Sequence, residues 1–216
     1  MENDEQGLRK ETIVEALAQL NESLKNAGTH GEICLFGGTA MVLAFNARLS
    51  TKDVDAIFQP PHIFRKAAAE IAQTMGLPED WLNDGVKGFV SAAPAYTEDD
   101  LPQMSNLRIF RPTAEYLLAM KCMASRSPAY DTKGDRDDIA FLVTHLGLRN
   151  AEEVLDTVEQ FYLPAQILPK THFMVLEVFE SLGNSRPGPP SGVTHLVKDP
   201  GEMPPELGEI KRQGYD

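Results

Sequence analysis

The stretch LFGGTAMVLAFNARLSTKDVD, residues 35–55, constrains the fold more than any other part of the chain. The apolar run EICLF (32–36) stops at two glycines, which predicts a short buried strand that ends in a turn. Residues 39–48 are apolar and rich in alanine, so we expect a short buried helix there. DVDAIF (53–58) alternates polar with apolar residues and predicts a second strand. Its two leading carboxylates either face solvent at a strand end or hold something positively charged.

Further helices and strands are predicted on both sides of this stretch. Apolar residues at helical spacing predict amphipathic helices over 11–26 and 62–75. VKGFV (86–90) and NLRIF (106–110) are strand candidates, and the prolines and acids between them predict a loop. The first half of the chain therefore combines a small sheet with helices.

The second half of the chain is predicted to be helical. We expect helices over 112–126, 135–147 and 170–183, and one more that begins after Asn150, a residue type that caps helices well. Residues 184–216 are rich in proline and glycine and show no period, which predicts a loose or extended tail.

Together these elements predict an α+β fold that is close to α/β, built in three parts. Residues 1–111 form a small mixed β-sheet with flanking helices, residues 112–183 form a helical part, and residues 184–216 form the extended tail.

Composition narrows the class of protein. A formal net charge of -12 argues against broad, sequence-independent nucleic-acid binding, which needs a positive surface, but it leaves room for a small basic pocket. No apolar run reaches the roughly 18 residues of a membrane span, and no apolar signal segment follows the acidic first residues. We therefore expect a cytoplasmic protein without a membrane partner. Cys34 and Cys122 are expected to be buried reduced thiols, and the histidine spacing does not predict a zinc site.

The two glycines favour a close approach of a ligand to the backbone. Glycine lacks Cβ, so Gly37 and Gly38 let backbone N–H groups come near a ligand, and the helix that Thr39 begins directs its positive end to the same place. This setting favours phosphate. The alternative is a tight turn between strand and helix, with no ligand.

The two aspartates favour a divalent cation. Side chains of a strand alternate, so Asp53 and Asp55 leave the same face with Cα atoms roughly 6–7 Å apart. Mg²⁺ or Mn²⁺ prefers carboxylate oxygens together with water and substrate phosphate. The alternative is a pair of solvated carboxylates at the end of the strand.

At this point the sequence resembles the nucleotidyltransferase fold of the DNA polymerase β superfamily. The signature of that superfamily is a strand, a GG or GS turn, a helix and a D-x-D strand, which Gly37-Gly38-Thr39 and Asp53-Val54-Asp55 match. Ser50, in the run RLSTKDVD, also resembles the signature, as does Arg48. The resemblance is to minimal bacterial proteins of the AbiEii toxin type and their uncharacterised relatives.

A second block, over 107–121 and 131–142, is similar to the later motifs of these relatives. The helix that holds Lys121 and the acidic start of the next helix, with Asp135, Asp137 and Asp138, follow in the order of the family. The resemblance implies that Lys121 meets nucleotide phosphates and that Asp138 either holds Lys121 or contacts the nucleotide. Two other readings stay open: Lys121 lies among apolar residues and could extend to solvent, and acids at a helix start stabilise its positive end.

Polymerase-β-type enzymes usually have a third carboxylate, on a later strand, that acts as a base. NLRIF offers no acid, so we take Asp84 as the candidate, with a turn residue in Asn-Asp-Gly as the alternative.

The resemblance implies a metal-dependent nucleotidyltransferase that moves a nucleoside monophosphate from a nucleoside triphosphate to a hydroxyl. The acceptor is an RNA end, a protein or a small molecule, and AbiEii-type toxins imply a neighbouring antitoxin or toxin partner. The alternative is a degenerate, non-catalytic member of the fold that serves as a nucleotide-binding adaptor or antitoxin.

Overall fold

The structure, a computed structural model, describes residues 7–124 and 133–184 and has the predicted α+β fold. In the described part a five-stranded mixed sheet has the order β5-β4-β2-β7-β6, and two further strands, β1 and β3, pair separately. The strands are β1 (Leu8–Arg9), β2 (Gly31–Leu35), β3 (Ser50–Thr51), β4 (Val54–Gln59), β5 (Leu82–Asn83), β6 (Tyr96–Thr97) and β7 (Leu107–Pro112).

The strand directions place the carboxyl ends of β2 and β7 side by side. β2 runs parallel to β7 and antiparallel to β4, while β5 runs parallel to β4 and places Asn83 opposite Asp55. The carboxyl ends of β2 and β7 and the first residues of β4 therefore lie at the same end of the sheet. The glycine turn, the two aspartates and the entry to the helical part all meet at this end.

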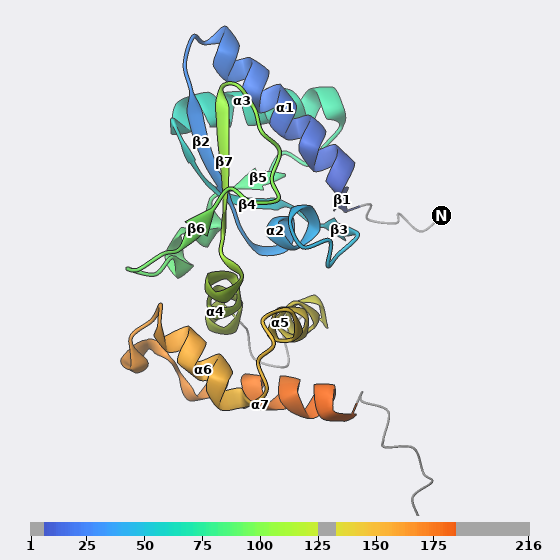
Figure 1. The fold of residues 1–216 in the computed structure, drawn as a ribbon. Helices are drawn as coiled ribbons and strands as arrows, with labels where there is room; N and C mark the ends of the chain where they lie inside the picture. The colour runs from blue at the N-terminus through green and yellow to red at the C-terminus, as the bar shows by residue number, and fades with distance from the viewer. Residues whose placement is uncertain (1–6, 125–132, 185–216) are drawn as a thin grey trace, which may run out of the picture.

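Helices surround the sheet unevenly. In Figure 1, α4 to α7 lie below the sheet, at the end to which β7 leads, whereas α1 and α3 lie along its upper part. The helices are α1 (Lys10–Asn26), α2 (Gly37–Leu43), α3 (Pro61–Met75), α4 (Ala114–Ala124), α5 (Lys133–His145), α6 (Ala151–Glu159) and α7 (Pro169–Asn184), with short 3₁₀ turns η1 (Gly85–Phe89) and η2 (Pro164–Gln166).

The buried side chains form two hydrophobic cores. The first joins α1 and α3 to one face of the sheet, to which alternate residues of the strands such as Ile33, Leu35 and Ile109 contribute. The second is made mainly by α4 to α7, and it also includes Phe36, Ala40 and Met41. Because these last residues belong to α2 and the turn before it, α2 connects the sheet to the helical part.

Most predicted elements are confirmed, with shifts at their ends. The helices predicted over 11–26, 62–75 and 135–147 correspond to α1, α3 and α5. Asn150 caps α6 as predicted, since its side-chain oxygen accepts a hydrogen bond from the backbone N–H of Glu153 at 2.9 Å. Of the helix predicted over 112–126, α4 covers 114–124, and residues 125–126 and the tail beyond 184 lie outside the described residues.

Three predictions were wrong. Residues 86–90 do not form a strand: residues 86–89 belong to η1, which begins at Gly85, and Val90 follows it. The N–H of Gly85 donates to Asn83 Oδ1 at 3.1 Å, and this local turn competes with strand pairing. The loop that follows contains β6, which pairs with the end of β7. The helix after the glycines begins at Gly37 itself and ends at Leu43, short of the predicted residue 48.

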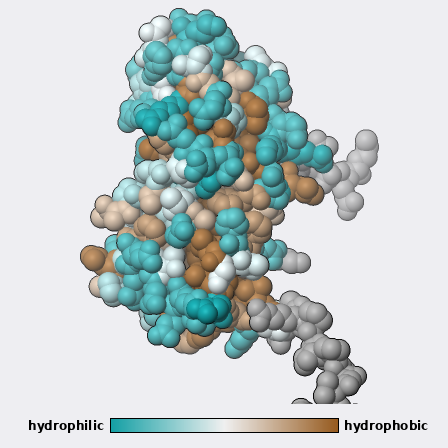
Figure 2. All heavy atoms as spheres, in the orientation of Figure 1, coloured by the Kyte–Doolittle hydropathy of each residue, from teal (hydrophilic) through white to brown (hydrophobic). Residues whose placement is uncertain are grey.

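The surface mixes hydrophilic and hydrophobic side chains. Figure 2 shows hydrophobic residues reaching the surface of the helical part among hydrophilic ones. Large exposed apolar side chains of this part are Leu163, Leu168, Phe173 and Leu176. Among the described residues there is no helix with the length and apolar character to cross a membrane. Cys34 and Cys122 are free thiols, as expected, although Cys34 is only partly buried.

Candidate functional site

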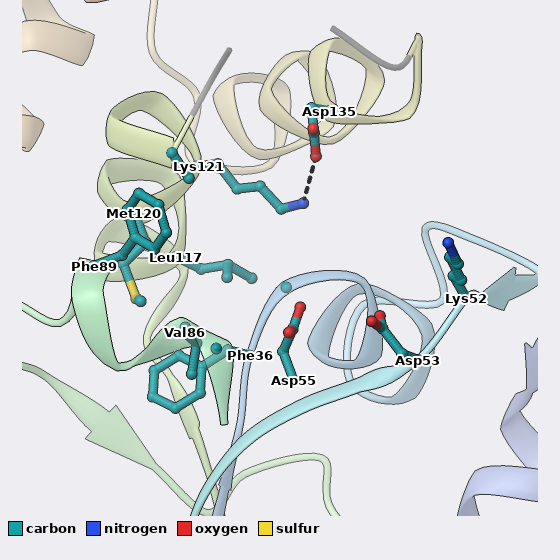
Figure 3. A pocket seen from close by; sticks show the side chains of 13 residues that line it. Phe36, Lys52, Asp53, Asp55, Val86, Phe89, Leu117, Met120, Lys121 and Asp135 are labelled. Atoms are coloured by element: carbon teal, nitrogen blue, oxygen red, sulfur yellow. Dashed lines mark hydrogen bonds and ion pairs between the residues drawn. The ribbon is translucent and has the colours of Figure 1, made fainter. Parts of the chain in front are cut away.

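A cavity of about 500 Å³ lies where the sheet meets the helical part. The glycine turn, the start of β4, η1, α4 and α5 all contribute to it, as Figure 3 shows. Its lining residues are Phe36, Gly37, Lys52, Asp53, Asp55, Gly85, Val86, Phe89, Leu117, Met120, Lys121, Ala124 and Asp135. The cavity has the size of a small-molecule site and combines charged with apolar side chains.

Asp53 and Asp55 both point into this cavity (Figure 3). Asp53 immediately precedes β4, and its Oδ2 accepts a hydrogen bond from Asn83 Nδ2 at 3.1 Å. The backbone oxygen of Asp55 accepts a hydrogen bond from Phe36 N at 2.9 Å, which ties β4 to the glycine turn. The predicted convergence of the two carboxylates on one space is therefore present.

The pKa values of both carboxylates are raised. Burial raises the pKa of Asp53, against a smaller opposing effect of Lys52. Burial also raises the pKa of Asp55, and the charge of Asp53 raises it further. A divalent cation between them would relieve both effects, because it replaces lost solvation and separates two like charges.

Both glycines of the turn are required by close packing. Gly37 has a φ of +55°, and a Cβ at this position would lie 2.9 Å from Asp55 Oδ2. A Cβ on Gly38 would overlap Thr51 Oγ1. The turn thus has a steric reason for its glycines, and Gly37 also brings the backbone directly against an acidic side chain of the cavity.

Thr39 and Ser50 lie away from the cavity lining. Thr39 is fully buried, and its Oγ1 donates to the backbone oxygen of Asp53 at 3.1 Å. Ser50 belongs to β3, opposite Arg9 of β1. The geometry therefore gives Thr39 a structural task, the positioning of Asp53, and gives Ser50 a place in a strand pair.

Lys121 extends from α4 towards α5 and not into solvent. Its side chain is 11% exposed, and its Nζ lies 3.0 Å from Asp135 Oδ1 and 2.7 Å from Asp138 Oδ2. The contact with Asp138 is an ion pair whose angles are not those of a hydrogen bond. Lys121 is thereby held at the edge of the cavity, across from Asp53 and Asp55 (Figure 3).

Asp138 joins two cations from different parts of the chain. It is 2% exposed and lies between Lys121 and Arg48, whose Nε contacts its Oδ1 at 2.5 Å. Arg48 also donates to the backbone oxygen of Gly134. Asp138 therefore supports Lys121 from behind and does not line the cavity, whereas its neighbour Asp137 is exposed.

The structure does not bring Asp84 to the cavity. Its carboxylate contacts Lys87 Nζ at 2.5 Å and Arg65 Nη2 at 3.3 Å, and the hydrogen bond from Lys87 lowers its pKa. The residue beside Asp55 on β5 is Asn83, an amide. The turn reading of this segment fits the geometry better than the catalytic one.

Sequence analysis assigns no specific role to three residues of this region: Asn83 and Phe89 are not singled out, and Asp135 is named only as part of an acidic group. Asn83 orients Asp53, Asp135 lines the cavity, and Phe89 forms part of its apolar wall. β5 is too short for any periodicity to reveal it, so Asn83 carried no signal. Asp135 was visible as part of an acidic helix start, but only the fold shows that it reaches Lys121.

The donor set fits a cation that is shared with a ligand. Among the described residues no cluster of three histidine, cysteine or acidic side chains could hold a metal ion alone. Mg²⁺ is commonly held by one or two carboxylates, with water and substrate phosphates as the other ligands. Asp53 and Asp55, which line one cavity of small-molecule size, meet the carboxylate part of that requirement.

Comparisons of this chain with protein-family models, with curated proteins and with solved structures found no match.

Proposed function

We propose that this protein binds a nucleoside triphosphate with a divalent metal ion and transfers the nucleoside monophosphate to a hydroxyl acceptor. The observation that supports this most is the meeting of Asp53, Asp55, the Gly37 turn and Lys121 in one cavity. Carboxylates for a metal and a cation for phosphates are both needed for phosphoryl-group chemistry, which depends on positioning and charge neutralisation.

Each group of the cavity has a task in this proposal. Asp53 and Asp55 hold the ion, which, when bound, neutralises triphosphate charge and polarises the α-phosphate. Lys121 acts as a point charge on the phosphates opposite the carboxylates. Gly37 lines the cavity and lies against Asp55, so the absence of a side chain there lets the phosphates come close to the backbone of the turn.

The reaction is an in-line displacement at the α-phosphorus. The acceptor oxygen forms the new bond, the bond to the bridging oxygen of the β-phosphate breaks, and pyrophosphate leaves with the electron pair. The acceptor proton passes to solvent or to a carboxylate. Asp135 is the third acid among the described lining residues, but it is already paired with Lys121. The acceptor itself and an antitoxin partner stay predictions that rest on the resemblance.

Transfer of label from α-³²P-labelled nucleoside triphosphates tests the proposal. The purified protein is incubated with Mg²⁺ and a cell lysate, and we expect label on a protein, RNA or small-molecule fraction. Asp55→Asn removes this label, whereas Asp84→Asn keeps it because Asp84 lies outside the cavity lining. Absence of any labelled product, or equal labelling by wild type and Asp55→Asn, contradicts transfer.

A second candidate function is nucleotide binding without transfer. It is favoured by one observation: an amide, Asn83, takes the position opposite Asp55 where a third carboxylate would complete the acidic group. This function predicts saturable, metal-dependent nucleotide binding by the purified protein and no labelled product with any acceptor. The same labelling experiment, together with a binding isotherm, separates the two functions.

A further inference from the structure

One side of the cavity has no part in binding metal or phosphate. It is formed by apolar side chains, and Figure 3 shows Phe89 and Met120 on the left of the view, with Asp55 near its middle and Asp53 on the right. Phe89 is a large apolar residue of the described lining, and 43% of its surface is exposed to solvent. Leu117 and Met120 beside it are buried. The cavity thus has a charged end and an apolar end with an aromatic ring at its edge.

The backbone at Phe89 and two residues beyond it is hydrogen-bonded to two tyrosines. The hydroxyl of Tyr162 donates to the carbonyl oxygen of Phe89 at 2.5 Å, and the N–H of Ser91 donates to the hydroxyl of Tyr116 at 2.9 Å. Both tyrosines are buried in the helical part. A single exposed apolar residue is common, but the backbone at and near this one is hydrogen-bonded to buried hydroxyls while its side chain lines a cavity.

We propose that Phe89 is the platform on which the base of the bound nucleotide stacks, an inference that rests on the proposed function. With the phosphates at Asp53, Asp55 and Lys121, the apolar end is left for the base. Aromatic rings bind bases by stacking, and every base has a π-face. A phenylalanine has only two side-chain torsions to lose when a base stacks on it, and the Phe89 carbonyl is already hydrogen-bonded, so the entropic cost of stacking is small.

The same lining predicts weak discrimination between bases. The described apolar lining residues carry no polar side-chain atoms that could read the edge of a base. Stacking without edge contacts tolerates different bases. We therefore expect purine and pyrimidine triphosphates to bind to the same platform.

Calorimetric titration with ATP, CTP and inorganic triphosphate, each with Mg²⁺, tests the platform in the full chain. Phe89→Ala should weaken ATP and CTP by about 5- to 150-fold, the range measured when a stacking aromatic is removed, and leave inorganic triphosphate unchanged. Phe89→Tyr should retain nucleotide affinity because it keeps the ring. Phe173→Ala, which removes an exposed aromatic from α7 away from the cavity lining, is the matched control and should change nothing.

The outcomes separate the two proposals. Equal effects of Phe89→Ala on nucleotides and on inorganic triphosphate, or no effect on either, overturn the platform. If wild type binds ATP and CTP with different affinities and Phe89→Ala leaves the ratio of the two affinities unchanged, the platform is overturned as well. If wild type binds neither nucleotide nor inorganic triphosphate, the proposed function fails and the platform fails with it. If wild type binds inorganic triphosphate as tightly as ATP, the platform alone fails.

Discussion

At the scale of single residues, Gly37 is where backbone conformation and site chemistry meet. Its positive φ strains any L side chain, and a Cβ would lie 2.9 Å from Asp55 Oδ2. Gly28 has a similar φ of +65° but open space around the position of a Cβ. An alanine at Gly28 therefore introduces backbone strain alone, whereas an alanine at Gly37 introduces the same strain and also displaces the Asp55 carboxylate.

We expect Gly37→Ala and Gly28→Ala each to lower the free energy of unfolding by at least about 1–2 kcal/mol, the cost of the left-handed conformation. Only Gly37→Ala should also weaken binding of a metal–nucleotide complex, because its Cβ displaces Asp55. Urea unfolding and binding isotherms on both variants measure the two effects. Equal loss of binding in both variants would show that the turn acts through stability alone.

Asp55 carries the second prediction at this scale. Burial and the charge of Asp53 raise its pKa, so its ionised form destabilises the folded state above the unfolded pKa, and this effect is relieved as pH falls through the folded pKa. Asp55→Asn removes the charge. We expect Tm to rise at neutral pH, by roughly 2 to 4 °C for each kcal/mol of relieved free energy in a chain of this size.

The gain in Tm should shrink as pH falls through the raised pKa of Asp55 in the folded state, and it should be lost by about pH 4, the ordinary range of an aspartate, where the wild-type carboxyl is neutral. Thermal unfolding followed at several pH values without metal measures it. A lower Tm for Asp55→Asn at neutral pH would mean that the carboxylate stabilises the fold and that its charge is already balanced within the protein.

At the scale of elements, α4, α5 and the loop after α2 are joined by the contacts of Asp138 with Lys121 and Arg48. Asp138→Ala leaves two cations facing each other without their buried counter-charge. We expect a loss of about 3–5 kcal/mol in the free energy of unfolding, typical when one partner of a buried ion pair is removed. Asp137→Ala, one residue away and exposed, should change it by less than about 0.5 kcal/mol.

Urea unfolding of both variants measures the difference. A double-mutant cycle with Arg48→Ala then isolates the pairwise interaction. Similar small losses in Asp138→Ala and Asp137→Ala would show that the buried pair contributes little and that Lys121 is positioned by other contacts.

The long elements could be predicted from the sequence because their periodicity is strong. α1, α3 and α5 have clear apolar spacing, and Asn150 caps α6 through a hydrogen bond within its own turn. β5 and β6 could not be predicted, since each has two residues and exists only by pairing with a strand distant in sequence. Residues 86–90 have the composition of a strand, but the local turn at Asn83 decides their structure.

The same distinction holds for the site. The juxtaposition of Gly37, Asp53 and Asp55 follows from a local strand–turn–helix–strand order, so the sequence predicts it. The positions of Asp84 and Asp135 depend on how β5 and α5 pack, and no pattern in the sequence contains that information. Asp135 is in the cavity lining and Asp84 is not.

At the scale of the whole molecule, the sheet and the helical part should not unfold separately. Apolar residues that directly follow strand β2 of the sheet are buried in the second core, namely Phe36, Ala40 and Met41. We expect one cooperative urea transition, in which the fluorescence of Trp81, buried in the first core, coincides with the loss of far-UV circular dichroism. Two separated transitions would show that residues 1–111 fold independently of the helices.

A bound divalent ion between Asp53 and Asp55, shared with a triphosphate, is the central claim, and Mn²⁺ titration followed by electron paramagnetic resonance tests it directly. Free Mn²⁺ is measured with wild type, with Asp53→Asn/Asp55→Asn and with Asp84→Asn, each with and without a nucleoside triphosphate. We expect weak binding without nucleotide and tighter ternary binding with it, retained in Asp84→Asn and lost in the double variant. Mn²⁺ binding by the double variant equal to that of wild type would contradict the site.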